Sequence, residues 1–272
     1  KKIEFIKMHG LGNDFVIIDR RHSYIEISKD MINRLSDRKE GAGCDQLITI
    51  DKSESKNYAA SIQIFNPNGD QAEACGNGTR CISKLLFDEK NDLKYLKLKS
   101  DAGILSAYKI DQNTISVNLG KISNNWKDIP LLKKIDTLNI PISLENLSLG
   151  VAVNVGNPHI VFFGKNIKNF DLAKYGPQIE NNKIFPNKTN VEVVEVINRK
   201  IIKMRVWERG AGITLACGSG ACASVYAGML KNLIDNKVEV KLAKGSLHIE
   251  IQNNEAIMTG PAEISYKGSL EV

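Results

Sequence analysis

Two cysteines stand in matching surroundings in the two halves of the chain. Cys75 opens the tetrapeptide CGNG and Cys217 opens CGSG, and each follows a loop and precedes an apolar stretch. A cysteine at the start of a helix meets unpaired backbone N–H groups and a partial positive charge, which favour the thiolate. Two such thiols on opposite faces of one carbon could take a proton from one side and return one to the other. The pair predicts inversion of a stereocentre, with no cofactor and no metal.

The glycines that follow each cysteine make room for an anion. Without side chains they let backbone N–H groups approach a carboxylate closely. A carboxylate held between two helix N-termini would place its α-carbon between the two sulfurs. The repeat therefore predicts a small carboxylic acid as substrate.

Other polar positions also recur in the same order in both halves. The matched pairs are Asn13 with Asn157, Gln46 with Asn190, and Asn66 with Glu208. Their amides can bind both ammonium and carboxylate groups. The second half adds Arg209, which can hold a carboxylate through two hydrogen bonds, and His159, two residues after Asn157. This ordered repeat predicts a pseudo-symmetric molecule with one site between its halves and an amino acid as ligand.

Composition narrows the class of protein. The 272 residues carry 37 basic and 31 acidic side chains, but the lysines are scattered and aromatic residues make up only 6%. We therefore expect no nucleic-acid partner. No apolar run reaches the 18 or so residues of a membrane span, and the first residues, KKIEFIKMHG, do not resemble a signal peptide. We expect a cytoplasmic protein without a membrane partner.

Three further cysteines, Cys44, Cys81 and Cys222, have no matching context, so we expect them to be small buried hydrophobes. An odd number of cysteines does not indicate a disulfide framework. The chain has no CxxC motif and no cysteine beside a His-x-Glu or HExxH group, which disfavours a zinc site.

Short β-branched or alternating stretches dominate the chain. The expected strands are 3–7, 15–19, 47–50, 61–65, 96–99, 104–110, 114–119, 151–155, 160–163, 190–196, 201–206, 237–242, 247–251, 255–259 and 263–272. Ser28 can cap a surface helix with one apolar stripe. The helix after Cys217 is small or apolar on every side, and the helix after Cys75 is similar but more polar. Both are expected to be buried.

A buried helix among many strands in each half predicts an α+β fold. We expect two pseudo-symmetric domains, each a strongly curved sheet or barrel wrapped around a central helix. The first domain covers residues 1–120 and the second 121–262.

At these residues the chain resembles the diaminopimelate epimerases. The matching motifs are KMHGLGNDFVIID (7–19), GAGCDQL (41–47), FNPNGDQAEACGNGTRC (65–81), GNPH (156–159), TNVEVVEV (189–196) and ERGAGITLACGSGACAS (208–224). The resemblance implies a cofactor-independent isomerase that interconverts LL- and meso-diaminopimelate, for lysine and peptidoglycan precursor synthesis. It also implies that residues 263–272 return to the first domain, and that the protein forms a homodimer.

The resemblance implies a role for each site residue. Cys75 and Cys217 would be the acid/base pair. The substrate would be held by Asn13, Gln46, Asn66, Gly76, Asn77, Asn157, Asn190, Glu208, Arg209, Gly218 and Ser219. His159 and Glu208 would set protonation near the cysteines. The chain departs from the family pattern in the loop 66–71 and at Ile213, neither of which changes an assigned residue.

Two other functions remain open from the sequence. A proline or hydroxyproline racemase shares the two-cysteine logic, but those proteins resemble CGHG and DRSPCGTG at the two sites. Asn77 and Glu208-Arg209-Gly210 argue against that class. A non-catalytic amino-acid-binding protein of the same fold is expected to lack one cysteine, and both are present.

Overall fold

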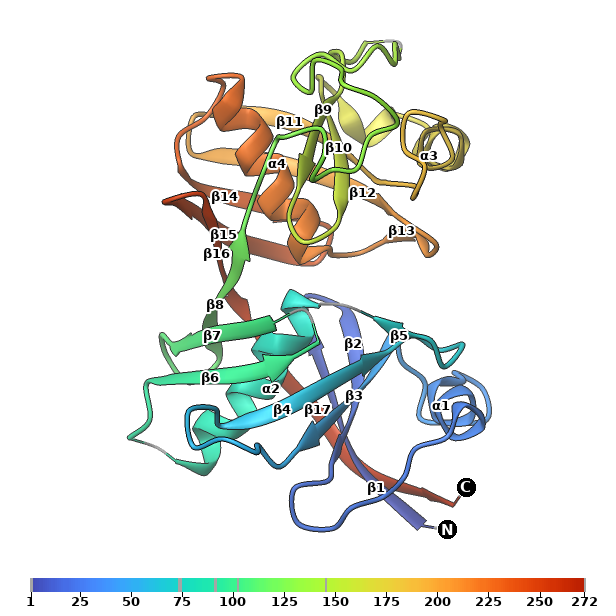
Figure 1. Ribbon diagram of the computed structural model, residues 1–272, viewed down its shortest axis with the longest axis vertical. Coiled ribbons are helices and arrows are strands. Elements are labelled where there is room, and N and C mark those ends of the chain that lie inside the picture. Colours follow the sequence, from blue (N-terminus) through green and yellow to red (C-terminus); the bar gives the residue numbers. More distant parts are fainter. Residues whose placement is uncertain (1, 73–74, 91, 102, 145, 272) are drawn as a thin grey trace. The chain divides into compact units, whose positions relative to one another are not determined.

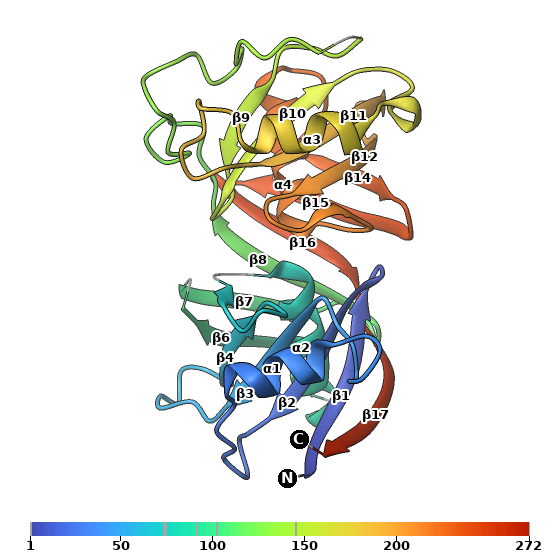
Figure 2. The same cartoon turned by 90° about the vertical axis from the view of Figure 1, so that its right-hand side faces the viewer.

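The protein consists of two compact units, described here from a computed structural model (Figures 1 and 2). The structure describes residues 2–72, 75–90, 92–101, 103–144 and 146–271. Unit 1 comprises Lys1–Val117 and Gly260–Val272, and unit 2 comprises Asn118–Thr259. The chain passes between the units along β8 (Thr114–Lys121) and β16 (Glu255–Pro261). Unit 1 is therefore assembled from two separate stretches of chain.

Unit 1 is a mixed sheet with two helices. Its remaining elements are β1 (Lys2–Gly10), β2 (Asn13–Asp19), α1 (Lys29–Ser36), β3 (Gln46–Asp51), β4 (Ala60–Phe65), β5 (Gln71–Ala72), α2 (Gly76–Glu89), β6 (Tyr95–Ser100), β7 (Gly103–Lys109) and β17 (Glu263–Glu271). β2 pairs with β3 in parallel, β3 with β4 antiparallel, and β4 with β6 in parallel. β17 pairs antiparallel with β1, so the last strand completes the sheet that the first one begins (Figure 2).

Unit 2 repeats this arrangement. Its elements are β9 (Val151–Asn154), β10 (Pro158–Phe163), the 3-10 helix η1 (Ile167–Asn169), α3 (Leu172–Glu180), β11 (Asn190–Asn198), β12 (Ile201–Glu208), β13 (Gly212–Thr214), α4 (Gly218–Leu230), β14 (Lys237–Leu242) and β15 (Gly245–Gln252). β10 pairs with β11 in parallel, β11 with β12 antiparallel, and β12 with β14 in parallel. The four strands of unit 2 therefore pair in the same sequence of parallel, antiparallel and parallel contacts as β2, β3, β4 and β6 of unit 1.

The strand registers confirm the internal repeat residue by residue. Gln46 lies opposite Phe15 in β2–β3, and Asn190 lies opposite His159 in β10–β11. One strand further on, Leu47 pairs with Phe65, as Val191 pairs with Trp207. The matched pairs read from the sequence therefore occupy equivalent places in the two sheets, and His159 stands where unit 1 has Phe15.

Each sheet surrounds a buried helix, as predicted. α4 contacts β9, β10, β11, β12, β14 and β15, and its residues Gly220–Gly228 are all buried (Figure 1). α2 contacts β1, β2 and β7 and buries even Arg80 and Lys84. The α+β fold class is confirmed, and all expected strands are present with ends displaced by a few residues at most; residue 272 lies outside the described residues.

A second helix covers the opposite face of each sheet. α1 begins after Ser28, whose side chain accepts a hydrogen bond from the Met31 N–H, and it buries Ile32 and Leu35 against the sheet. α3 packs Leu172 and Ile179 into the corresponding core of unit 2. The sequence prediction was incomplete here, because α3, η1, β5 and β13 were not expected. Among the described residues, no helix is both long and apolar enough to cross a bilayer.

Candidate active site

The first half of the candidate site is built around Cys75 in unit 1. Cys75 is the N-cap of α2 in extended conformation, and its Sγ accepts a hydrogen bond from the Gly78 N–H at 3.4 Å. The thiol also faces Oδ1 of Asn13 at 3.8 Å. The same Oδ1 accepts from Nδ2 of Asn77 at 3.0 Å. Asn13, Cys75 and Asn77 therefore form one cluster of polar contacts. Residues 73 and 74 of the motif at 65–81 lie outside the described residues.

Gln46 and Asn66 form the second polar group of unit 1. Nε2 of Gln46 donates to Oδ1 of Asn66 at 3.1 Å. Gln46 begins β3 and Asn66 follows β4, so the antiparallel pairing of these strands brings the two amides to the same edge of the sheet. Both side chains are half-buried, which leaves polar atoms for a ligand.

The second half of the candidate site is built around Cys217 in unit 2. Cys217 is the N-cap of α4, and its Sγ accepts from the Gly220 N–H at 3.4 Å. Ser219 Oγ lies 3.5 Å from the same sulfur. The local geometry thus repeats that of Cys75. Gly218 and Ser219, like Gly76 and Asn77, begin a helix, where backbone N–H groups have no intrahelical partner.

At Cys217 the helix start acts in the expected direction, but other effects on the pKa of the thiol are larger. Burial, followed by the carboxyl groups of Glu208 and Glu192, raises the pKa of this thiol well above its ordinary value. The hydrogen bonds from Ser219 and Gly220 act in the opposite direction and are outweighed. A buried thiolate beside two acids loses more solvation than two hydrogen bonds restore.

His159 lies in a buried polar chain with Asn157 and Glu192. Its Nε2 is 2.7 Å from Oδ1 of Asn157, and its Nδ1 is 2.7 Å from Oε1 of Glu192. Burial raises the pKa of Glu192, and the nearby His159 acts against this. Glu192 is the functional candidate that the sequence analysis missed. It shares one face of β11 with Asn190, and this period-two pattern of polar side chains in an apolar strand was the available signal.

Asn190 fixes the turn that carries Glu208 and Arg209. Its Oδ1 accepts from the Arg209 N–H, and its Nδ2 donates to the carbonyl of Pro158, both at 2.9 Å. Glu208 accepts a hydrogen bond from the hydroxyl of Thr214. Burial raises the pKa of Glu208, whereas hydrogen bonds from Thr214 and Cys217 lower it. The sequence-predicted acid therefore contacts the sequence-predicted thiol.

The last residue of helix α3, Glu180, holds the turn that carries Glu208 and Arg209. Oε1 of Glu180 accepts from the Gly210 N–H at 3.0 Å, and Oε2 accepts from Trp207 Nε1 at 2.7 Å. Gly176 allows this close packing, because a Cβ there would lie 2.5 Å from the Trp207 ring. The guanidinium of Arg209 reaches the carbonyl of Asn187 at 3.2 Å.

The structure places the predicted residues in two separate sets, one within each unit. The first holds Asn13, Gln46, Asn66, Cys75, Gly76 and Asn77. The second holds Asn157, His159, Asn190, Glu208, Arg209, Cys217, Gly218 and Ser219. The other three cysteines, Cys44, Cys81 and Cys222, are buried, as expected.

The fold is that of known epimerases and related proteins. The chain aligns over its full length with a phenazine biosynthesis protein of the PhzF family from Enterococcus faecalis, with a TM-score of 0.67 and 13% identity, covering 100% of both chains. It aligns equally with a hydroxyproline epimerase from Agrobacterium vitis solved with bound trans-4-OH-L-proline, with a TM-score of 0.69 and 10% identity, covering 99% and 91% of the two chains. These similarities define the class of fold.

Sequence comparison identifies the family within that class. The family described as diaminopimelate epimerase matches residues 5–124 and 151–265. The chain is 43% identical to a diaminopimelate epimerase of Pelagibacter ubique over 95% of both proteins. It is 40% identical to the corresponding protein of Zymomonas mobilis, covering 98% of this chain and 97% of that one. The chain belongs to the diaminopimelate epimerase family.

Proposed function

We propose that the protein is a diaminopimelate epimerase, which interconverts LL-2,6-diaminopimelate and meso-diaminopimelate. Its membership of the family and its full-length similarity to curated epimerases support this function. The observation that carries the proposal is the pair of equivalent helix caps, because Cys75 caps α2 and Cys217 caps α4 through the same contact with the N–H three residues on.

In the proposed reaction the two thiols act as a proton acceptor and a proton donor. One cysteine, as thiolate, takes the α-proton, and the C–H electron pair stays on the carbon. The other cysteine donates its S–H proton to the opposite face. One S–H bond forms and one breaks, so nothing is oxidised or reduced, and the cysteines exchange roles in the reverse direction.

The substrate's α-carboxylate is assigned to the first backbone N–H groups of α2 and α4, at Gly76, Asn77, Gly218 and Ser219. Helix N-termini bind anions through such groups. The remaining ammonium and carboxylate groups are assigned to Asn13, Gln46, Asn66, Asn157, Asn190, Glu208 and Arg209. His159 and Glu208 would set the protonation state around Cys217, consistent with the hydrogen bond between Glu208 and that thiol.

Exchange of the α-hydrogen with solvent tests the proposal. The wild-type protein in D₂O should incorporate deuterium at the α-carbon of LL- and meso-diaminopimelate, as followed by NMR. Cys75→Ala and Cys217→Ala should each lower the exchange rate by at least about 100-fold, the usual contribution of one acid or base. Cys44→Ala, which removes a buried thiol of unit 1, is the matched control and should retain the rate.

Two results would replace this function. Exchange of proline but not of diaminopimelate would assign the protein to the proline racemases. Binding of diaminopimelate without exchange would make it an amino-acid-binding protein.

We further propose that the protein is cytoplasmic, acts in lysine and peptidoglycan precursor synthesis and forms a homodimer, without a nucleic-acid or membrane partner. These assignments follow the family resemblance. Light scattering after gel filtration would give the mass, and a mass of 30.1 kDa, that of one chain, would contradict the dimer.

A further inference from the structure

The orientation of the Asn13 amide is fixed by contacts on both of its ends. Its Nδ2 donates to Oδ2 of Asp45 at 2.9 Å. Its Oδ1 accepts from Nδ2 of Asn77 at 3.0 Å and faces the thiol of Cys75. Rotating the amide by half a turn would place its oxygen against the Asp45 carboxylate and its nitrogen against the Asn77 NH₂. Both hydrogen bonds would be lost, so the carbonyl oxygen stays directed at the sulfur.

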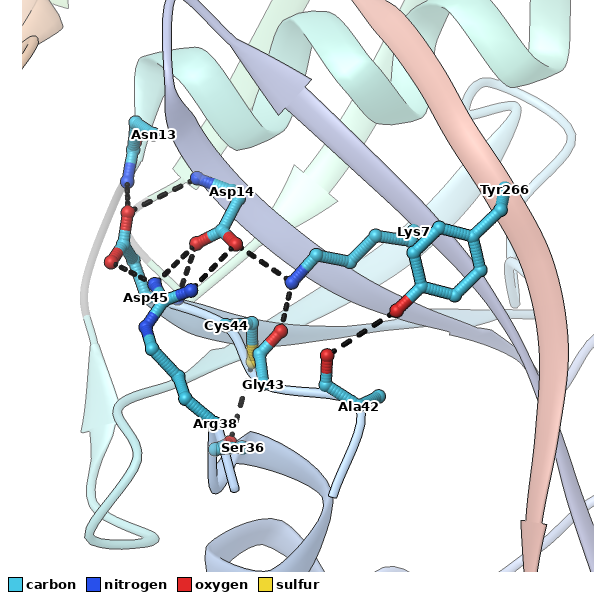
Figure 3. Close-up of polar contacts among 10 residues, drawn as sticks. All are labelled: Lys7, Asn13, Asp14, Ser36, Arg38, Ala42, Gly43, Cys44, Asp45 and Tyr266. Atoms are coloured by element: carbon cyan, nitrogen blue, oxygen red, sulfur yellow. Dashed lines mark hydrogen bonds and ion pairs between the residues drawn. The ribbon is translucent and has the colours of Figure 1, made fainter. Parts of the chain in front are cut away.

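Asp45 is itself held in place by a charged cluster, formed by Lys7, Asp14, Arg38 and Asp45 (Figure 3). Arg38 Nη2 donates to Oδ1 of Asp45 at 2.7 Å, which leaves Oδ2 for Asn13. Oδ2 also accepts the backbone N–H of Asp14 at 3.1 Å. Each oxygen of Asp45 therefore has a defined partner.

Asp14 is the centre of the charged cluster. Figure 3 shows Arg38 and Lys7 reaching it from different sides: both Nη atoms of Arg38 bond to Asp14, at 3.0 and 2.7 Å, and Lys7 Nζ lies 2.7 Å from Oδ2. Asp14 Oδ1 accepts the Asp45 N–H at 2.9 Å. Asp14 and Asp45 thus cap each other's backbone, and the two cations balance their charges.

The contacts of the Cys75 sulfur include one donor and one acceptor that act in opposite directions. The Gly78 N–H points at it, as a thiolate requires, but the Asn13 carbonyl accepts an S–H proton and repels a thiolate. Cys81, further along α2, acts on Cys75 electrostatically only when ionised, and burial raises the pKa of Cys81 to about 12. The fixed Asn13 amide is thus a contact that favours the thiol form of Cys75 over the thiolate.

We propose that Asp45 is a positioning residue, which holds the Asn13 carbonyl toward Cys75 and thereby stabilises the protonated thiol. The inference rests on the proposed function in that it takes Cys75 to be one of the acid/base groups. In that reaction the fixed carbonyl would orient the S–H proton before it is donated.

Alkylation of Cys75 in the absence of substrate tests the inference. Iodoacetamide reacts with the thiolate, so the rate as a function of pH, followed at the Cys75 peptide by mass spectrometry, gives a midpoint pH. Asp45→Ala releases the Asn13 amide and should lower this midpoint by about 0.5 pH unit or more, the effect of one hydrogen bond. An unchanged midpoint would overturn the proposal.

Two comparisons separate positioning from the charge of Asp45. Asp45→Asn removes the charge but keeps an oxygen for the Asn13 NH₂, so its midpoint should lie closer to that of the wild type than the midpoint of Asp45→Ala. In an Asn13→Ala background, Asp45→Ala should produce no further shift. Equal shifts in both backgrounds, or equal shifts for Asn and Ala at position 45, would show that charge alone acts and would overturn the inference.

Asp235→Ala is the matched control, because Asp235 forms a half-exposed ion pair with Arg199 at 2.7 Å in unit 2. It should leave the midpoint unchanged. If Asp45→Ala does not fold, Asp45→Ser takes its place in the alkylation experiment.

The alkylation experiment uses no substrate. A failure of the wild type to exchange diaminopimelate would therefore reject the proposed function without affecting the measured role of Asp45.

Discussion

Nδ1 of His159 lies 2.7 Å from Oε1 of Glu192, and neither side chain is exposed to solvent. The other ring nitrogen faces Oδ1 of Asn157, so both nitrogens of the imidazole point at oxygen atoms. A neutral imidazole carries only one N–H. Burial raises the pKa of Glu192, which favours the arrangement in which the Glu192 O–H donates to Nδ1 and the Nε2–H donates to Asn157.

This proton arrangement predicts that Glu192→Gln is tolerated. The amide NH₂ of Gln can replace the acid O–H as a donor to His159, so kcat/KM should stay within about tenfold of the wild type. Glu192→Leu removes the donor and should lower the free energy of unfolding by about 1–3 kcal/mol. Nitrogen NMR of His159 would report the tautomer. If Gln is as damaging as Leu, a charged Glu192 is required instead.

Glu208→Gln should make Cys217 more reactive. Burial is the main reason for the raised pKa of this thiol, and the Glu208 carboxyl group is the next. Removing that charge should shift the alkylation profile of Cys217 to lower pH. Ser219→Ala removes a hydrogen bond that lowers the same pKa and should shift the profile to higher pH. Shifts in the same direction for both variants would contradict this account.

Asp14→Asn should alter the pH dependence of stability. Although burial acts to raise the pKa of Asp14, hydrogen bonds from Arg38 and Lys7 outweigh it and lower the pKa from 3.8 to about 2. A lowered pKa stabilises the fold above the unfolded value, and this contribution is lost as pH falls through the folded value. Urea unfolding should therefore show a deficit of roughly 2 kcal/mol at pH 6 that shrinks below pH 4. A deficit independent of pH would show that ionisation is not its cause.

Glu180→Leu should loosen the turn that carries Arg209. It leaves the Gly210 N–H and the Trp207 indole N–H without their acceptor, each at a cost of about 1–3 kcal/mol where buried. We expect a lower melting temperature and a KM that rises more than kcat falls. Gln178→Ala, an exposed change on the same helix, is the control. An unchanged KM would show that α3 does not position this turn.

Most of the fold and of the candidate site was predicted from the internal repeat. The matched positions of Gln46 and Asn190 predicted a pseudo-symmetric molecule, and the two residues do occupy equivalent places, beside Phe15 and His159. The small apolar residues after Cys217 likewise indicated a central buried helix. Such patterns lie within one short segment, and the segment adopts the predicted structure in the folded protein.

The features that the sequence did not predict, helix α3 and the role of Asp45, depend on contacts between residues far apart in the chain. α3 includes Gly176 and Pro177, which are poor helix formers, and it is stabilised by packing against Trp207. It stands at the place that α1 occupies in unit 1, so the repeat itself was the usable signal. The role of Asp45 could not be read from GAGCDQL, because its partners Arg38 and Asn13 are defined only once β2 and β3 pair.

The pairing of β1 with β17 sets an order of assembly. Unit 2 is one uninterrupted stretch, so every strand it needs has left the ribosome once residue 259 has emerged. Unit 1 cannot close its sheet until residues 263–271 follow, and until then the edge of β1 stays open to other strands. Unit 1 therefore completes its sheet only after every strand of unit 2 has been made.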